Sequence, residues 1–225
     1  MIVRGEIPPA TPPREKTKMV LRRFSSLAVT AALTLTTILA IAQDSDDVRH
    51  IRFTEDVVAL EYVGNVNNSG ANSSQFGYFS FVTQLPAFNG TPEDAAHANF
   101  TFFTEAITQR VTTNGTLRIV DRTGTTTVYL ATSSPSFADP DTFRSGTPIQ
   151  VSTMQQQVIL DTTTGDFSVV NVNTVTNTLT FSLLGQAYQL GKMGDRFRTL
   201  LRGKTNAVPP PGFFIAGYAV GVGKN

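Results

Sequence analysis

The chain has 225 residues, a formal net charge of +1 and 40% hydrophobic residues, so it is long enough for one domain with a sizeable core. It contains no cysteine, which excludes disulfides, thiol nucleophiles and thiolate metal sites.

The first part of the chain has the pattern of an export signal. Arg22 and Arg23 form a positive region, an uncharged apolar run follows, and Ala40-Ile41-Ala42 is a small-x-small cleavage site before Gln43. This order is typical of a secretory signal peptide. The run is shorter than the roughly 20 apolar residues of a membrane anchor. We therefore expect cleavage near Ala42-Gln43, export to the periplasm or the extracellular space, and no transmembrane span in the mature protein.

Three segments follow from this interpretation. Residues 1–18 are proline-rich and polar, so we expect them to be a misassigned extension before a start at Met19. Residues 19–42 are the signal peptide, and residues 43–225 are a single exported domain. Removing residues 1–42 takes away six basic and two acidic residues, which changes the formal charge from +1 to −3. Such a domain lacks the excess of positive charge that binding to nucleic acid requires, so no nucleic-acid partner is expected. The lack of disulfides in an exported domain favours a bacterial source.

The mature region is rich in threonine, valine and phenylalanine, whose branched or aromatic side chains suit a pleated surface. No window shows a sustained helical period. The pattern predicts an all-β fold, a single antiparallel meander barrel of lipocalin size, with a two-sheet β-sandwich as the alternative. Short helical turns are expected at Thr91-Pro92-Glu93-Asp94 and Asp139-Pro140-Asp141. Strands are expected over residues 57–64, 75–84, 100–112, 116–122, 125–131, 149–161, 167–176, 179–184, 187–190, 197–204 and 213–222.

The hairpin around Asn114-Gly115 determines which side chains are expected inside the barrel. A three-residue loop that ends at Gly115 places Val111 opposite Leu117 and Gln109 opposite Ile119, so that apolar residues face one another. The expected inner face then carries Phe103, Glu105, Ile107, Gln109, Val111, Leu117, Ile119 and Asp121. The opposite face, expected toward water, carries Thr104, Thr108, Arg110, Arg118 and Arg122.

A second hairpin turns at Thr163-Thr164-Gly165. The same argument pairs Val158 with Val170 and Gln157 with Asn171. Gln155 is set opposite Asn173, so two amide pairs are expected across one face of a long hairpin.

Paired acids are the strongest candidates for chemistry. In the expected register Glu105 and Asp121 are diagonal neighbours on the apolar face, roughly 7–8 Å apart. Two acids in a desolvating pocket acquire different pKa values, as acid–base catalysis requires. Glu61 could pair with Glu105 as in a glycosidase. The structural alternative is that the hairpin end is solvated or that a cation neutralises the acids.

The leading hypothesis is an exported small β-barrel that binds a small or apolar ligand inside, lined by Phe103, Ile107, Gln109, Leu117 and Ile119. A second hypothesis is a secreted isomerase, cyclase or glycosidase that uses the paired carboxylates. A third is a non-catalytic surface protein with a filled core. His50 and His97 have no metal-site spacing, so neither a metal nor a cofactor is expected.

Overall fold

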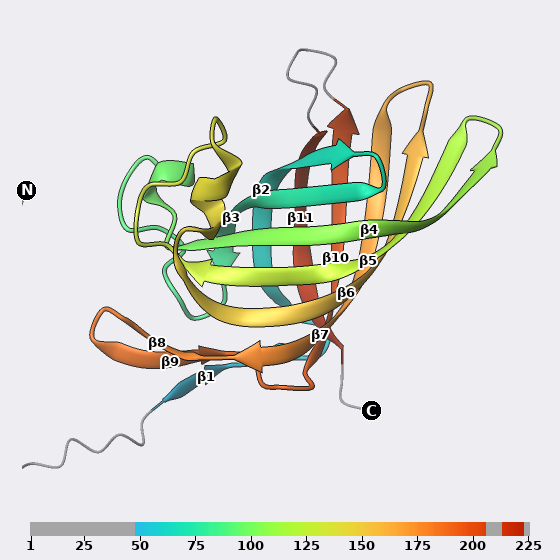
Figure 1. Cartoon of the computed structure of the whole chain (residues 1–225). Coiled ribbons are helices and arrows are strands. Elements are labelled where there is room, and N and C mark those ends of the chain that lie inside the picture. The colour runs from blue at the N-terminus through green and yellow to red at the C-terminus, as the bar shows by residue number, and fades with distance from the viewer. Residues whose placement is uncertain (1–47, 206–212, 223–225) are drawn as a thin grey trace, which may run out of the picture. The chain divides into compact units, whose positions relative to one another are not determined.

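The computed structural model describes residues 48–205 and 213–222, so the expected extension and signal peptide lie outside the described residues. The predicted all-β fold is confirmed. Eight strands form a closed barrel, three strands form a small sheet, and the helical segments of the described residues are two 3-10 turns (Figure 1). None of the described helical segments is long and apolar enough to cross a membrane.

The barrel is an antiparallel meander with one insertion. Its strands, in order around the wall, are β10 (Arg196–Thr205), β11 (Phe213–Val222), β2 (Val58–Ser69), β3 (Asn72–Val82), β4 (Phe100–Asn114), β5 (Leu117–Leu130), β6 (Thr147–Asp161) and β7 (Asp166–Thr178). β7 pairs with β10 and closes the wall. Between them, β8 (Thr180–Leu183) and β9 (Gln186–Leu190) leave the barrel and form the small sheet with β1 (Arg49–Ile51).

The strands form where branched and aromatic residues alternate with polar ones. In β7 the buried positions are Phe167, Val169, Asn171, Asn173 and Val175, with more exposed residues between them. The two strands expected over 116–122 and 125–131 are one continuous strand, β5. Gly124 lies at the expected break, where a side chain would collide with the Glu105 carbonyl of β4, so the glycine allows the two strands to stay paired.

The predicted hairpin registers are both wrong. β4 and β5 pair Asn114 with Leu117 and Val111 with Val120, with a bulge between Thr108 and Arg110. β6 and β7 pair Val158 with Val169, one position away from the expected register. Because a slip of one residue exchanges the two faces of a strand, these differences decide which side chains enter the barrel.

One end of the barrel is closed by side chains. Phe53, which follows β1, stacks on Phe197 of β10 with ring centroids 4.4 Å apart. The side-chain amide of Gln150 donates to the Leu190 carbonyl (2.9 Å), which ties the small sheet to β6. Phe100 and Phe181 meet edge to face at 5.8 Å. We call this the closed end and the opposite end, where the β2–β3, β4–β5 and β6–β7 hairpins turn, the open end (Figure 1).

Two predicted helical turns are confirmed, and they cover the outside of the wall. The first turn, η1 (Ala95–His97), directly follows the predicted residues, and the second is η2 (Pro140–Arg144). Asp139 caps η2 by accepting a hydrogen bond from the Asp141 N–H (3.2 Å). Phe143 of η2 is fully buried against Phe76 and Phe103 on the outer face of β3 and β4.

Candidate functional site

One row of polar side chains crosses the barrel interior. Thr108, Arg122, Gln156, Asn171 and Thr199 are direct register partners on the consecutive strands β4, β5, β6, β7 and β10. We call these five residues the polar row. Since side chains at paired positions share a face of the sheet, all five point into the lumen together.

Gln156 is the centre of the polar row. Its Nε2 donates to Asn171 Oδ1 (3.0 Å) and to Gln75 Oε1 (3.3 Å). Its Oε1 accepts from Gln75 Nε2 (3.1 Å) and from Arg122 Nη1 (3.1 Å). Asn171 Nδ2 donates in turn to Thr199 Oγ1 (2.7 Å). Because Gln75 belongs to β3, the glutamine pair spans the lumen, and Gln156 has no unused donor or lone pair.

Between the polar row and the closed end, the interior is filled. The rings of Tyr62, Phe79 and Phe102 contact one another with centroids 5.3 to 6.2 Å apart. The remaining space in this half is about 40 Å³. Burial raises the pKa of the Tyr62 phenol well above its usual range, and an interaction with Thr199 offsets part of this rise. This half is therefore an ordinary packed core with a neutral phenol.

Between the polar row and the open end, the interior is hollow. The cavity there has a volume of about 390 Å³ and opens to solvent, because its rim residues Asn68, Gly70, Ala71, Val111 and Arg118 are exposed. Its floor is formed by the polar side chains of Gln75, Thr108, Gln156 and Arg122. The remaining walls are apolar and consist of Val66, Val120, Val158, Leu160, Phe167, Val169, Leu201, Phe213 and Ile215.

Two arginines are the charged groups among the described residues that line this cavity. Arg122 is half-buried, and its Nε donates to Thr108 Oγ1 (3.3 Å) and its Nη2 to Asn68 Oδ1 (3.1 Å). Burial, and secondarily the charge of Arg118, lowers the pKa of Arg122, but a guanidinium keeps its proton at neutral pH. The cavity floor is therefore positively charged.

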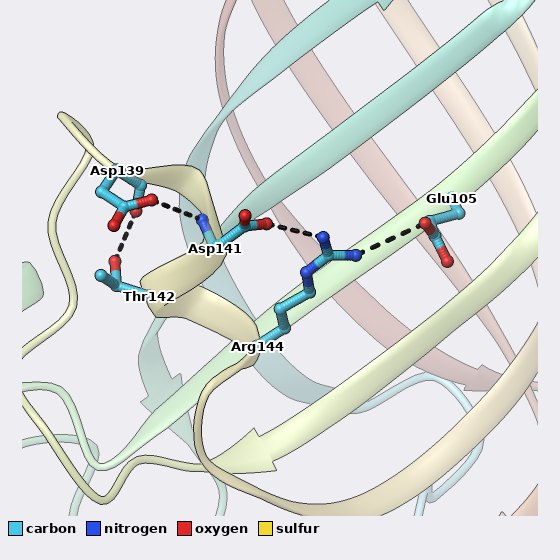
Figure 2. A network of polar contacts seen from close by, with 5 residues as sticks. All are labelled: Glu105, Asp139, Asp141, Thr142 and Arg144. Carbon is cyan, nitrogen blue, oxygen red and sulfur yellow. Dashed lines mark hydrogen bonds and ion pairs between the residues drawn. The ribbon is translucent and has the colours of Figure 1, made fainter.

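The predicted acids do not come together. Glu105 lies on the outer face, exposed, where its carboxylate is 3.5 Å from Arg144 Nη1; Figure 2 shows Arg144 between Glu105 and Asp141. Asp121 is also on the outer face, 2.6 Å from Arg110 Nη2. In the observed register Glu105 pairs with Thr125, which lies four positions along β5 from Asp121, a distance of about 13 Å. The diagonal contact expected between the two carboxylates is therefore absent.

The electrostatic surroundings of Asp121 favour its ionised form. The hydrogen bond from Arg110, together with a weaker one from Gln157, lowers the pKa of Asp121 below its ordinary value. Glu61 is exposed on the outer face of β2, with Tyr218 and Phe81 as its register partners. A catalytic role for Glu105, Asp121 or Glu61 stays a prediction, and none of the three lines the cavity.

The residues expected to line the interior also lie on the outer face. Phe103 is buried beneath η2, where Arg144 stacks over its ring at 4.6 Å. Ile107 and Leu117 are 54% and 39% exposed. Gln109 is exposed and donates to Thr123 Oγ1 (3.0 Å), and Ile119 is partly exposed opposite Ile159. Val111 alone of the expected inner face reaches the cavity, because the bulge at Gln109 reverses the alternation beyond it.

Four of the five residues that were expected to face water point into the barrel, and only Arg110 lies on the outer face as expected. Thr104, Thr108, Arg118 and Arg122 all point inward. The signal that could have located them is the expected pairing of amide side chains across β6 and β7. Such a pair does form, but between other residues than expected. Asn171 pairs with Gln156 and not with Gln157, and the pair is buried.

Comparisons of the chain with protein-family models, with curated proteins and with solved structures gave no match. Residues 48–205 and 213–222 contain no group of three or more His, Asp or Glu side chains placed to hold a metal ion.

Proposed function

We propose that the barrel binds a small, largely apolar molecule in its open half. The observation that carries this proposal is the cavity of about 390 Å³ with aliphatic walls and a mouth open to solvent. Small-molecule sites are concave, mostly apolar and typically of this size, with a few polar groups that orient the ligand. The interior of an eight-stranded barrel is wide enough either to be filled by side chains or to hold one small ligand.

The contrast with the other half of the same barrel supports the proposal. In the closed half, large aromatic side chains point inward and fill the interior. Around the cavity the inward residues are mostly valine and leucine, with Phe167 and Phe213 at its wall. A hollow that remains beside a well-packed core suits a ligand that completes the packing.

The proposal is tested by blocking the cavity with one side chain. Val169 lines it and is 4% exposed, whereas the next residue, Val170, points outward and is 43% exposed. We expect saturable binding of the neutral fluorescent probe N-phenylnaphthylamine to the purified protein. Val169→Phe should weaken this binding by about tenfold or more, because the added ring occupies ligand volume.

Val170→Phe is the matched control, since it makes the same change on the opposite face of the same strand. It should leave the affinity for the probe unchanged. The proposal is overturned if the wild-type protein shows no saturable binding, or if the two variants bind equally well. Native mass spectrometry of the purified protein, made before these titrations, checks that the cavity is free of any ligand carried through purification.

We also propose that this binding takes place outside the cytoplasm. The support is the arrangement of Arg22, Arg23, the apolar run and Ala40-Ile41-Ala42 ahead of the barrel. N-terminal sequencing of the protein recovered from the exported fraction should begin at Gln43. Recovery of an uncleaved chain from the cytoplasm alone would contradict this proposal.

A further inference from the structure

The positive charge of Arg122 at the cavity floor indicates which charge the ligand carries. Arg122 makes its three hydrogen bonds to the side chains of Thr108, Gln156 and Asn68, and all three acceptors are neutral. A guanidinium has five N–H donors, so two of them are not used by these bonds. Arg122 is half-buried below largely apolar walls, where an anion would be its strongest partner, so these two N–H groups are available to an anionic ligand.

Within residues 48–205 and 213–222, no acidic side chain forms an ion pair with Arg122. Asp121 is adjacent to Arg122 in sequence but points to the outer face, where it binds Arg110. Glu105 is on the outer face with Arg144. Among the described residues that line the cavity there is no carboxylate, and residues 206–212, between β10 and β11, contain neither Asp nor Glu.

A second cation lies at the rim of the same cavity. Arg118 lies on the same inner face of β5, at the exposed rim of the cavity, and makes no ion pair within the described part of the chain. The two positive charges repel each other, and this repulsion contributes to the lowered pKa of Arg122. Cations at the mouth and the floor of one cleft attract an anion from solution and direct it inward.

We propose that the ligand is an apolar molecule with a single anionic group, such as a carboxylate, sulfate or sulfonate, and that this group binds Arg122 at the floor of the cavity. The inference rests on the proposed function, since it names the class of ligand that the same cavity takes. The apolar part of the ligand contacts the valine and leucine walls. The anionic group accepts hydrogen bonds from the two guanidinium N–H groups that the protein leaves unused, as the oxygen atoms of carboxylates and other oxyanions do.

The test compares two probes that share one aromatic framework. Anilinonaphthalene sulfonate is the anionic counterpart of the neutral N-phenylnaphthylamine, and dodecanoate and dodecanol, measured by competition, form a second such pair. We expect the wild-type protein to bind the anionic member of each pair about tenfold or more tightly, since a hydrogen-bonded ion pair adds to the shared apolar contacts.

Substitutions locate the charge that is responsible. Arg122→Met should abolish the preference, so that the ratio of the two affinities falls to about one whatever the affinity for the neutral probe becomes, and Arg122→Lys should retain part of the preference because it keeps the charge without the planar fork. Arg198→Met, which removes an exposed arginine from the outer face of β10, is the charge-matched control and should retain the full preference.

The outcomes separate the two proposals. If neither probe binds, the proposed function fails and this inference fails with it. If both probes bind equally to the wild-type protein, or if Arg198→Met and Arg122→Met reduce the preference alike, the cavity binds apolar molecules but the inference about the anion is wrong. Should Arg122→Met fail to fold, the wild-type comparison of each probe pair and the Arg122→Lys variant still decide the question.

Discussion

The two halves of the barrel are built from the same eight strands but differ in what fills them. In the closed half, Phe53 and Phe197 stack at 4.4 Å and aromatic rings leave about 40 Å³. In the open half, aliphatic walls enclose about 390 Å³ over a floor that carries Arg122. The polar row separates the halves. The difference teaches that a packed core and an open cavity can occupy separate stretches of the same strands, so a substitution in one half should have effects unlike the same substitution in the other.

The largest expected effect is the loss of an aromatic ring from the closed half. Phe197→Ala should lower the free energy of unfolding by about 3–5 kcal/mol, because it opens a cavity in a packed region. The matched change in the open half is Phe167→Ala. Its loss of unfolding free energy should be smaller than that of Phe197→Ala by about 1 kcal/mol or more, since Phe167 already borders a hollow that water can enter. Chemical denaturation of both variants measures this difference, and equal losses would break the comparison between the halves.

The boundary between the halves can be tested at Gln156. Gln156→Leu leaves the side chains of Gln75, Asn171 and Arg122 without their shared partner, and we expect the free energy of unfolding to fall by about 2–3 kcal/mol. Gln155→Leu, one residue earlier, changes an exposed side chain on the outer face and should stay within about 0.5 kcal/mol of wild type. Similar stability of the two variants in denaturant titrations would show that the polar row contributes little.

The smallest expected effect concerns the outer face of the open half. The folded pKa of Asp121 lies below its ordinary value, so its stabilising contribution is present above the unfolded pKa and is lost as the pH falls through the folded pKa. Asp121→Asn should therefore melt slightly below wild type at neutral pH, and the gap should close in acid. Melting temperatures measured over this pH range check the prediction. Arg110→Met should remove the same dependence, and a gap that persists in strong acid would contradict it.

Much of the fold could be predicted from the sequence because each strand carries its own signal. The predicted strand over 213–222 agrees with β11, and that over 149–161 differs from β6 by two residues at its start. The turn at Asp139-Pro140 has its cap and its proline at adjacent positions, which is a local pattern that needs no tertiary contact. The strand β1 was missed, since its three residues pair only with β9, which is far away in sequence.

The candidate site could not be predicted, because register depends on more than matching apolar residues. Val158, Ile159 and Leu160 are consecutive, as are Val169 and Val170, so two registers one residue apart both place apolar side chains opposite each other. In the first hairpin, Ile119 and Val120 create the same ambiguity. The bulge beside Gln109 then reverses the faces along β4, and nothing in the local sequence marks it.

The closure of the barrel has a consequence for the order of events during folding. β2 is the first barrel strand in the chain and β11 the last, yet they are neighbours in the wall, with Glu61 paired to Tyr218. Contacts between such distant segments slow folding, because closing the long intervening loop costs chain entropy before the contacts between the two strands can stabilise the structure. The cavity of the open half includes Val66 of β2 and Ile215 of β11. It therefore cannot exist on the nascent chain until β11 has been synthesised, and the cavity is among the last features of the molecule to form.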